Sequence, residues 1–292
     1  MLRPFDKLTT QHERATGHAS TFARREHDET LLKSNLSKGQ YAYTVAMAPK
    51  GLSERAVRKQ VLAFASAEGF APVRIARADV LHEARTAALA RNREGMLADM
   101  AWMTEEWLTR ATDPGRFLDG ARSVILCALP YHSEEPVADD GRVTRGRIAR
   151  YARGRDYHKV LRGRLQTLAD RLAAEIGPFG HRVFTDSAPV LEVELAARSG
   201  LGWRGKHTLA LSRDAGSMFF LGELFVDVAL PPSAPVAAHC GSCSACIDVC
   251  PTQAITGPYR LDVRCWISYL TIEHDGPIPV ELRAAIGNRI YG

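Results

Sequence analysis

The feature that most constrains this chain is a run of closely spaced cysteines. Of six cysteines in 292 residues, four lie within eleven positions, at Cys240, Cys243, Cys246 and Cys250, and Pro251 follows directly. The spacing C-x2-C-x2-C-x3-C-P is typical of 4Fe–4S ligands, because two-residue gaps let three thiolates reach three corners of one cubane. Zinc is the alternative, although zinc sites usually pair C-x2-C units across longer intervals. The run therefore predicts an iron–sulfur module.

The number of thiolates is too small for two complete clusters of this kind. Two cubanes need eight thiolates, whereas the module offers the four of the run and Cys265. The sixth cysteine, Cys127, lies in an apolar run at 124–129 and is interpreted as a buried core thiol. Two interpretations stay open: one cluster is completed differently, or the chain is a piece that stops before its last ligands.

Positive charge is concentrated in one segment. The net charge is +5, yet residues 142–164 contain nine Lys or Arg and a single acid, Asp156. Such a segment suits a polyanion such as nucleic acid. The alternative is a solvated helix face preceded by a basic loop. The overall composition, 46% hydrophobic and 24% charged, excludes a chain that is disordered throughout.

The sequence gives no sign of export or of a membrane span. No apolar run approaches the roughly 18 residues of a spanning helix. Arg24 and Arg25 could begin a twin-arginine signal, but residues 26–29 are charged or polar where an apolar segment is required. We therefore expect a cytoplasmic protein without a membrane partner, in which crowded cysteines bind metal rather than form disulfides.

Periodicity divides the chain into three parts. Residues 1–50 lack a sustained period and are expected to be a poorly ordered extension. Residues 51–232 alternate between helical and strand patterns, which predicts an α/β or α+β domain of helices packed on a sheet. Prolines at 231, 232 and 235 then mark a boundary, and 233–292 is expected to be a ferredoxin-like module, incomplete at its C-terminal end. Helices are expected at 54–68, 80–93, 95–109, 156–176 and 189–199, and strands at 72–76, 123–129, 181–185, 208–212 and 218–230.

Several further motifs occur together, in one order, across residues 55–292. Besides the cysteine run they are Met100–Met103 (MAWM), Arg150–His158 (RYARGRDYH), Phe184–Pro189 (FTDSAP), Ser199–His207 (SGLGWRGKH), Leu221–Leu224 (LGEL), Arg264–Glu273 (RCWISYLTIE) and Gly287–Gly292 (GNRIYG). In this combination the chain resembles the epoxyqueuosine reductases, which are oxidoreductases of tRNA queuosine synthesis that depend on cobalamin and iron–sulfur clusters.

The resemblance implies a reaction and its cofactors. Members reduce epoxyqueuosine in tRNA to queuosine, the last step of queuosine synthesis, and remove the epoxide oxygen as water with two electrons and two protons. It implies a cobalamin bound between the domain at 51–232 and the 4Fe–4S module. Electrons from an external donor would enter through the clusters. The partner would be a tRNA with a queuosine-type anticodon, and the enzyme is expected to be a monomer.

The resemblance also implies roles for individual residues. Asp186 matches the proton donor to the leaving oxygen, although position alone favours a helix N-cap; as a donor near pH 7 it would need a raised pKa. Residues expected to bind cobalamin are Arg110, Arg150, Asp156, Tyr157, His158, Trp203, Gly205 and Lys206. For 156–158 the alternative is an N-cap followed by two surface residues, and for 203–206 it is a Gly-rich connector with a core tryptophan. Arg110 matches only loosely.

For the clusters, the resemblance assigns Cys240, Cys243 and Cys246 to the first and Cys250 and Cys265 to the second. Members of the family continue after the position of Gly292 with three more cysteines, so the ligand set of this chain is expected to be incomplete.

Two other functions compete with this one. A reductive dehalogenase-like enzyme would share cobalamin and ferredoxin-type clusters, but such enzymes typically carry the export signal that fails here. The basic segment also suits tRNA better than a small halogenated molecule. A plain electron-transfer ferredoxin with an unrelated fused domain is disfavoured by the ordered motifs within 100–224.

Overall fold

A computed structural model describes residues 52–132 and 146–292. The expected extension at 1–50 lies outside this range. The centre is a four-stranded sheet with the order β1-β2-β7-β4, formed by β1 (Val73–Arg77), β2 (Ser123–Pro130), β7 (Phe219–Val226) and β4 (His181–Phe184). Every neighbouring pair is antiparallel. The architecture is therefore of the α+β kind, with mixed helices and sheet as the sequence predicts.

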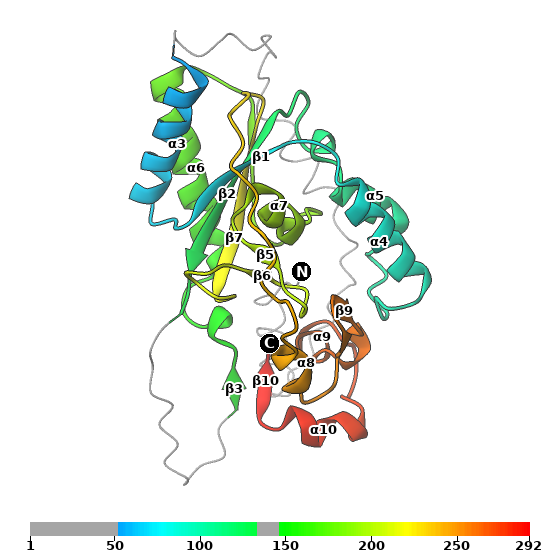
Figure 1. Ribbon diagram of the computed structural model, residues 1–292. Helices are drawn as coiled ribbons and strands as arrows, with labels where there is room; N and C mark the ends of the chain where they lie inside the picture. The colour runs from blue at the N-terminus through cyan, green and yellow to red at the C-terminus, as the bar shows by residue number, and fades with distance from the viewer. Residues whose placement is uncertain (1–51, 133–145) are drawn as a thin grey trace, which may run out of the picture.

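Helices cover both faces of this sheet, which makes three layers (Figure 1). On one face α3 (Glu54–Ala67) and α6 (Tyr157–Ile176) pack side by side over Ile125, Cys127 and Leu224. On the other face α7 (Glu192–Ser199) packs over Val124 and Leu126. Successive residues of a strand point to opposite faces. This alternation explains why β2 is apolar along almost its whole length.

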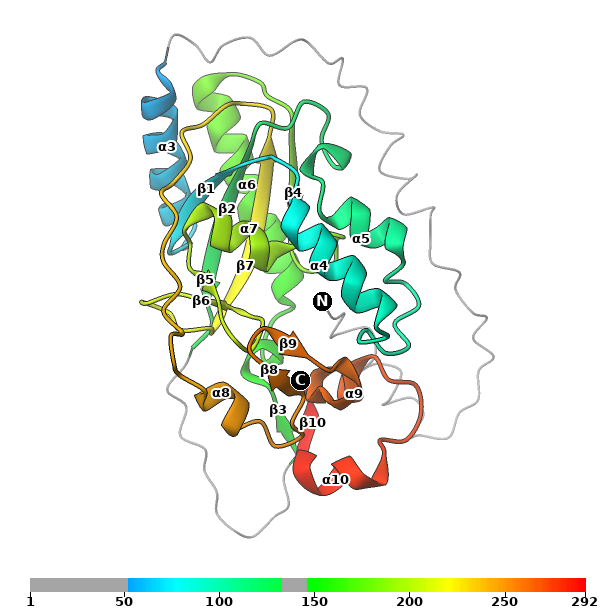
Figure 2. The ribbon, with the colours of Figure 1, turned by 45° about the vertical axis from the view of Figure 1, so that its right-hand side comes forward.

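The cysteine-bearing segment folds beside the three layers with small apolar clusters of its own. Figure 2 shows its helices below α4 (His82–Arg93) and α5 (Glu105–Ala111). The segment comprises α8 (Ala245–Asp248), β8 (Ile255–Gly257), β9 (Arg260–Leu261), α9 (Ile267–Ile272), α10 (Val280–Ile286) and β10 (Arg289–Tyr291), with the 3-10 turn η3 (Val263–Cys265). In β3 (Arg147–Ile148), the basic segment pairs in parallel with β10.

Most expected elements are present, and several differ in their bounds. The helix expected at 95–109 is wrong, because residues 94–104 form turns and α5 begins only after the N-cap Thr104. Gly95 and Ala98 have left-handed backbone there, and Ala98 and Met100 pack on the small core around Tyr269 and Leu270. The helix expected from Pro189 begins later, at Glu192.

Four shorter elements complete the fold. Two more 3-10 turns, η1 (Pro114–Arg116) and η2 (Arg150–Ala152), precede β2 and α6 respectively. The strand expected at 208–212 is shorter, as β6 (Ala210–Leu211) pairs with β5 (Trp203–Arg204). Within the described residues no helix has both the length and the apolar character needed to cross a membrane.

Candidate active site

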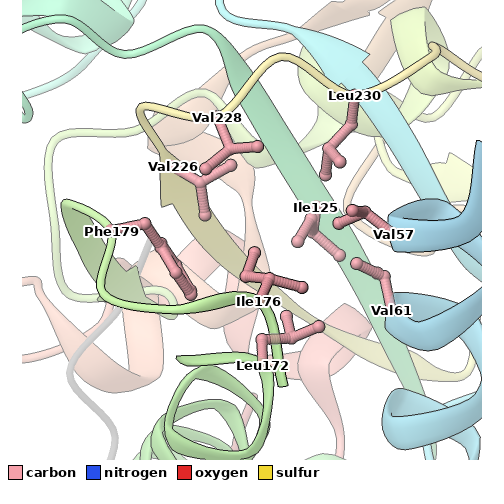
Figure 3. Close-up of a pocket in the computed structure, with 9 residues that line it drawn as sticks. All are labelled: Val57, Val61, Ile125, Leu172, Ile176, Phe179, Val226, Val228 and Leu230. Atoms are coloured by element: carbon pink, nitrogen blue, oxygen red, sulfur yellow. The ribbon is translucent and has the colours of Figure 1, made fainter. Parts of the chain in front are cut away.

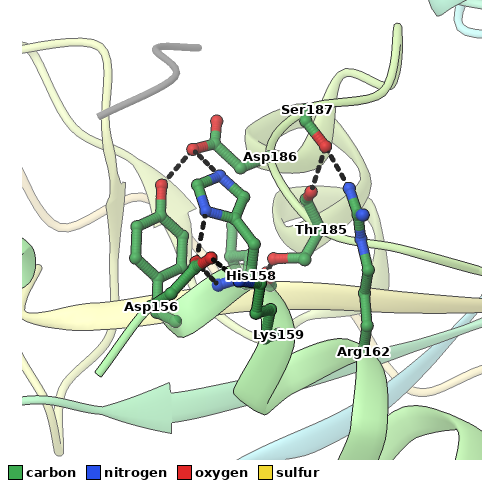
Figure 4. A network of polar contacts seen from close by, with 9 residues as sticks. Asp156, His158, Lys159, Arg162, Thr185, Asp186 and Ser187 are labelled. Atoms are coloured by element: carbon green, nitrogen blue, oxygen red, sulfur yellow. Dashed lines mark hydrogen bonds and ion pairs between the residues drawn. The ribbon is translucent and has the colours of Figure 1, made fainter. Parts of the chain in front are cut away.

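A chain of polar contacts joins the start of α6 to the turn between β4 and α7 (Figure 4). Asp156 is the N-cap of α6, and its Oδ1 accepts the backbone N–H of His158 at 3.0 Å. The same oxygen lies 3.0 Å from Nδ1 of His158, and Nε2 of that ring lies 3.2 Å from Oδ2 of Asp186. The imidazole therefore bridges two carboxylates. Asp186 also accepts the phenolic hydroxyl of Tyr157.

The Asp186 turn is held by its neighbours. Asp186 has a φ of +52°, in the left-handed region that aspartate tolerates better than most residues. On one side, the Thr185 hydroxyl donates to the Leu221 carbonyl at 2.8 Å. On the other, the Asp186 backbone N–H donates to Oε1 of Glu192 on α7. The Asp186 carboxylate thereby faces Tyr157 and His158, and the residue is not the N-cap of α7.

The carboxylates around His158 change its proton affinity. Burial lowers the pKa of His158, but the hydrogen bond and charge of Asp186, followed by those of Asp156, outweigh burial and raise the pKa above its ordinary value. An imidazolium can donate to both carboxylates at once, whereas a neutral ring can donate to only one. The arrangement therefore favours a protonated His158 beside Asp186.

Aromatic packing fixes the ring that contacts Asp186. Tyr157 is stacked between His158 and Phe220 of β7, with ring centroids 4.1 and 4.2 Å apart. Burial, and next the charge of Asp186, raise the pKa of Tyr157 far above its ordinary value. Tyr157 thus stays protonated, and a hydrogen-bond donor, at neutral pH. Both residues expected after the N-cap are buried or half-buried rather than at the surface.

Two buried acids near this site have no place among the residues expected from the sequence. Glu192 is 8% exposed and Glu223, on β7, is 0% exposed. The available signal was Glu223 itself, a charged residue inside the apolar strand FFLGELFV. Glu192 carried no such signal, since it looks like an ordinary acid in the first turn of a helix.

The other residues expected to contact a cofactor lie on separate elements. Trp203 is in β5, and its Nε1 is buried without a hydrogen-bond partner among the described residues. A side chain at position 205 would crowd His207, because a Cβ added to Gly205 would lie 2.6 Å from the His207 ring. Lys206 donates from Nζ to the carbonyl oxygens of Gly241 and Cys243, at 2.7 and 2.8 Å. It therefore ties β5 to the cysteine loop.

The two expected arginines lie earlier in the chain, on other elements. Arg150 is half-buried in η2, directly before the Asp156 cap. Arg110, at the end of α5, contacts the Phe117 ring and lines an open groove of about 400 Å³. The groove walls are otherwise formed by Glu105, Glu106, Thr109 and Arg116. A second, very small void, between α3, α6 and the sheet, is lined only by apolar side chains (Figure 3) and belongs to the core.

The cysteines differ in their surroundings. In the described ranges, no three His, Cys, Asp or Glu side chains converge on a point that could hold a metal ion. Burial raises the pKa of Cys250, but backbone N–H groups at 252, 254 and 255 and the Thr252 hydroxyl outweigh it and lower the pKa. Amides directed at sulfur suit a thiolate ligand. Cys265 lies close enough to Cys250 for repulsion to contribute, after burial and Asp262, to its raised pKa.

Two protein families match parts of the chain. Residues 111–187 match the family described as "Epoxyqueuosine reductase QueG, DUF1730", and this stretch contains the whole polar chain from Asp156 to Asp186. Residues 239–292 match the family described as "4Fe-4S double cluster binding domain", which includes the five cysteines of the module.

Curated relatives are similar over most of the chain. The epoxyqueuosine reductase of Alicycliphilus denitrificans is 56% identical over 232 residues, which cover 77% of this chain and 64% of the relative. That of Burkholderia pseudomallei is 51% identical over 251 residues, covering 77% and 61%. That of Pseudomonas aeruginosa is 64% identical over 146 residues, covering 50% and 40%. The chain thus spans less than two thirds of the length of these proteins.

Solved structures give the same result for the fold. An epoxyqueuosine reductase in complex with an epoxyqueuosine-modified tRNA-Tyr stem loop aligns with a TM-score of 0.76 at 28% identity, over 82% of this chain and 63% of that one. The Bacillus subtilis epoxyqueuosine reductase, with its catalytic loop swung out of the active site, aligns with a TM-score of 0.75 at 28% identity and the same coverage.

Proposed function

Since this chain belongs to the epoxyqueuosine reductase family, we propose that the intact protein reduces epoxyqueuosine in tRNA to queuosine. The observation that carries this proposal is the Asp186 carboxylate, held in a left-handed turn against His158 and Tyr157. A reductase of this kind must protonate the leaving oxygen, because an alkoxide is a poor leaving group at neutral pH. The site offers a carboxyl group and a second proton carrier directly behind it.

The proton steps follow from these contacts. Removal of an epoxide oxygen as water breaks two C–O bonds, leaves a carbon–carbon double bond and consumes two electrons and two protons. In this proposal Asp186 delivers protons to the oxygen, and His158, as an imidazolium, returns a proton to Asp186 through the 3.2 Å contact. Asp156 holds the far side of the ring, as in other acid–base pairs with an orienting carboxylate. Tyr157 keeps the Asp186 carboxylate oriented.

Cobalamin is the proposed redox cofactor. Its polar side chains need hydrogen-bond partners, and the buried groups without one among the described residues include the Trp203 indole N–H and the Tyr291 hydroxyl. These groups fit such a ligand, and we assign its binding to residues of the polar chain and to residues on α5, on η2, on β5 and directly after β5. They are Arg110, Arg150, Asp156, Tyr157, His158, Trp203, Gly205 and Lys206. When bound and reduced, cobalamin supplies the electrons for the epoxide carbons.

The 4Fe–4S domain supplies the proposed path for those electrons from an external donor. We assign Cys240, Cys243 and Cys246 to one cluster and Cys250 and Cys265 to a second. The amides around Cys250 and the proximity of Cys265 support the second assignment. We further propose 51–232 as the cobalamin-binding domain and 233–292 as the cluster module.

The proposed RNA surface adjoins the proposed proton donor. Exposed basic side chains lie in the segment that leads into α6 and in its first two turns, at Arg147, Arg153, Arg155, Lys159 and Arg162. Arg162 donates to the hydroxyl of Ser187, the residue after Asp186 (Figure 4). Phosphate contacts position a nucleic acid on a protein. Basic residues here would present a tRNA loop to Asp186.

The proposal is tested with the intact protein, a reductant and tRNA that carries epoxyqueuosine. Conversion to queuosine is measured by mass spectrometry of the nucleosides, with and without added cobalamin. We expect conversion only when cobalamin is bound. Conversion at an undiminished rate by cobalamin-free protein, or none by the fully loaded protein, contradicts the proposal.

A further inference from the structure

The buried carboxyl groups of Glu192 and Glu223 lie directly behind the Asp186 turn. Glu192 is the first residue of α7, and its Oε1 accepts the Asp186 backbone N–H. Glu223 lies in β7 opposite Phe184, two residues before Asp186, and is 0% exposed. Apart from the carboxyl group of Glu192, neither carboxylate oxygen of Glu223 has a hydrogen-bond partner among the described residues. A buried pair of acids without a basic partner is costly for a fold, so its presence here points to a function.

We infer that Glu192 is the positioning residue of Asp186 and that Glu223 keeps Glu192 protonated or shares its proton. The inference rests on the proposed function, because it takes Asp186 as the proton donor. Glu192 fixes the backbone at the position where the chain turns left-handed, and so sets the direction of the Asp186 carboxylate. A donor that is misplaced by about 1 Å loses up to about 100-fold in rate.

The charges around the pair explain why it holds a proton. Burial, and next repulsion by Asp186, raise the pKa of Glu192 to about 8, and burial together with Glu192 raises the pKa of Glu223 well above its usual range. The titratable groups that face the pair are Asp186 in the turn, Tyr157 on α6 and Cys127 on β2. Each of these three groups is either neutral or negatively charged, so none of them stabilises a second negative charge.

Two ionised carboxylates in this position would repel each other and Asp186. We therefore expect the turn to keep its geometry while the pair holds a proton and to loosen as pH rises through the raised pKa of Glu192. Glutamine keeps the oxygen that accepts the Asp186 N–H but cannot ionise. Leucine removes the acceptor and keeps a similar volume.

Three variants of the intact, cofactor-loaded protein separate these roles: Glu192→Gln, Glu192→Leu and Glu194→Gln. Glu194 lies on the same helix and pairs with Arg204 at 2.9 Å, so it is the matched control. Without substrate, hydrogen–deuterium exchange of the Asp186 amide should be about tenfold faster in Glu192→Leu, the worth of one hydrogen bond. Exchange in Glu192→Gln and in the control should stay slow.

With substrate, Glu192→Leu should lower kcat by about tenfold or more while the KM for tRNA changes by less than about twofold. Glu192→Gln should restore most of kcat near pH 7 and move the alkaline limb of the pH–rate profile to higher pH. Wild-type exchange and kcat in Glu192→Leu overturn the inference. If Glu192→Leu does not fold, the inference is overturned when the alkaline limb of the pH–rate profile stays at the wild-type pH in both Glu192→Gln and Glu223→Gln. The exchange measurement needs no turnover, so it stands even if wild-type protein fails to reduce epoxyqueuosine.

Discussion

At the scale of single residues, the proposed proton donor lies at a position with unusual backbone geometry. Asp186 combines a left-handed backbone, a carboxylate that accepts two side-chain donors and an amide held by a buried acid. None of these features is needed to build the three-layer core. Strained, over-determined positions of this kind cluster at sites of chemistry.

Replacing this carboxylate should separate chemistry from binding. Asp186→Asn keeps the size of the side chain and removes its exchangeable acid proton, so we expect kcat to fall by about 100-fold or more. Cobalamin and tRNA affinities should change little, as measured by absorbance titration and filter binding. The exposed Asp170 of α6 is the control, as Asp170→Asn. Wild-type turnover in Asp186→Asn would return Asp186 to a purely structural role.

His158 should make stability depend on pH. Because its pKa is raised in the folded protein, its contribution is fully present below its ordinary value of about 6.5 and is lost as pH rises through the raised pKa. His158→Gln should therefore lower the free energy of unfolding by about 1.5–3 kcal/mol at pH 6, and by less at pH 9. Urea unfolding across this range measures the difference. The exposed His82→Gln is the control, and a pH-independent difference in His158→Gln contradicts the argument.

At the scale of elements, the chain ends α7 with a glycine that no other residue can replace easily. Gly200 has a φ of +71°, and a Cβ there would lie 2.0 Å from the Ala234 carbonyl oxygen. Gly200→Ala should therefore lower the free energy of unfolding by about 2–5 kcal/mol, from left-handed strain plus overpacking. Gly216→Ala has a similar φ of +58° with nothing within 4 Å, and should lose only the strain, about 1–2 kcal/mol. Equal losses in urea unfolding would show that the contact with Ala234 is unimportant.

The contribution of Lys206 to the stability of the cysteine loop can be measured by removing its ammonium group alone. Lys206→Met removes the ammonium that binds the carbonyls of Gly241 and Cys243 but keeps the length of the side chain. We expect amides of residues 240–246 to exchange with deuterium about tenfold faster, for the loss of about 1–1.5 kcal/mol of local stability. Lys159→Met, also an exposed lysine, should leave that loop unchanged. Unchanged exchange in Lys206→Met would mean that other interactions hold the loop.

Periodicity predicted the strands of the sheet and the helices on it, because the spacing of apolar residues in each element reflects which of its faces is buried. The strand at 123–129 and the helix at 156–176 were expected within one residue of β2 and α6. Only residues 105–109 of the helix expected at 95–109 are helical, because tertiary contacts decide the stretch before them: Ala98 and Met100 pack on the cysteine-bearing segment. No local pattern records such a contact.

The residues of the candidate site, too, could be predicted from the sequence only in part. Asp156, His158 and Asp186 were identified through motifs, but motifs cannot show that one imidazole bridges both carboxylates. Glu192 was missed because its burial depends on α7 lying against the sheet at β1, β2 and β7, which only the folded chain reveals. The roles of Trp203, Gly205, Lys206 and the cysteines remain predictions.

At the scale of the whole molecule, the basic segment joins two parts of the fold. Its start pairs with β10 and its end forms α6 against the sheet. Replacing Arg147, Arg153 and Arg155 by alanine should weaken tRNA binding and reduce the slope of log affinity against log salt by about 0.7–0.9 for each phosphate that is no longer neutralised. Removing charge from α3 with Arg55→Ala and Lys59→Ala should leave the slope unchanged. An unaltered slope in the triple variant would place the RNA elsewhere.

The strand order also determines when the molecule can fold. The central strand β2 ends at Pro130, and its neighbour β7 begins only at Phe219. All elements from β3 to β6 lie between these two strands in the chain. During synthesis on the ribosome, one edge of the apolar strand β2 therefore stays unpaired until β7 has been made. The strand β4 also has no strand to pair with until then. Pairings so distant in sequence form slowly and leave intermediates that associate easily. The sheet can thus be completed only after Val226 has been made, and nascent chains that stall before that residue expose the apolar edge of β2.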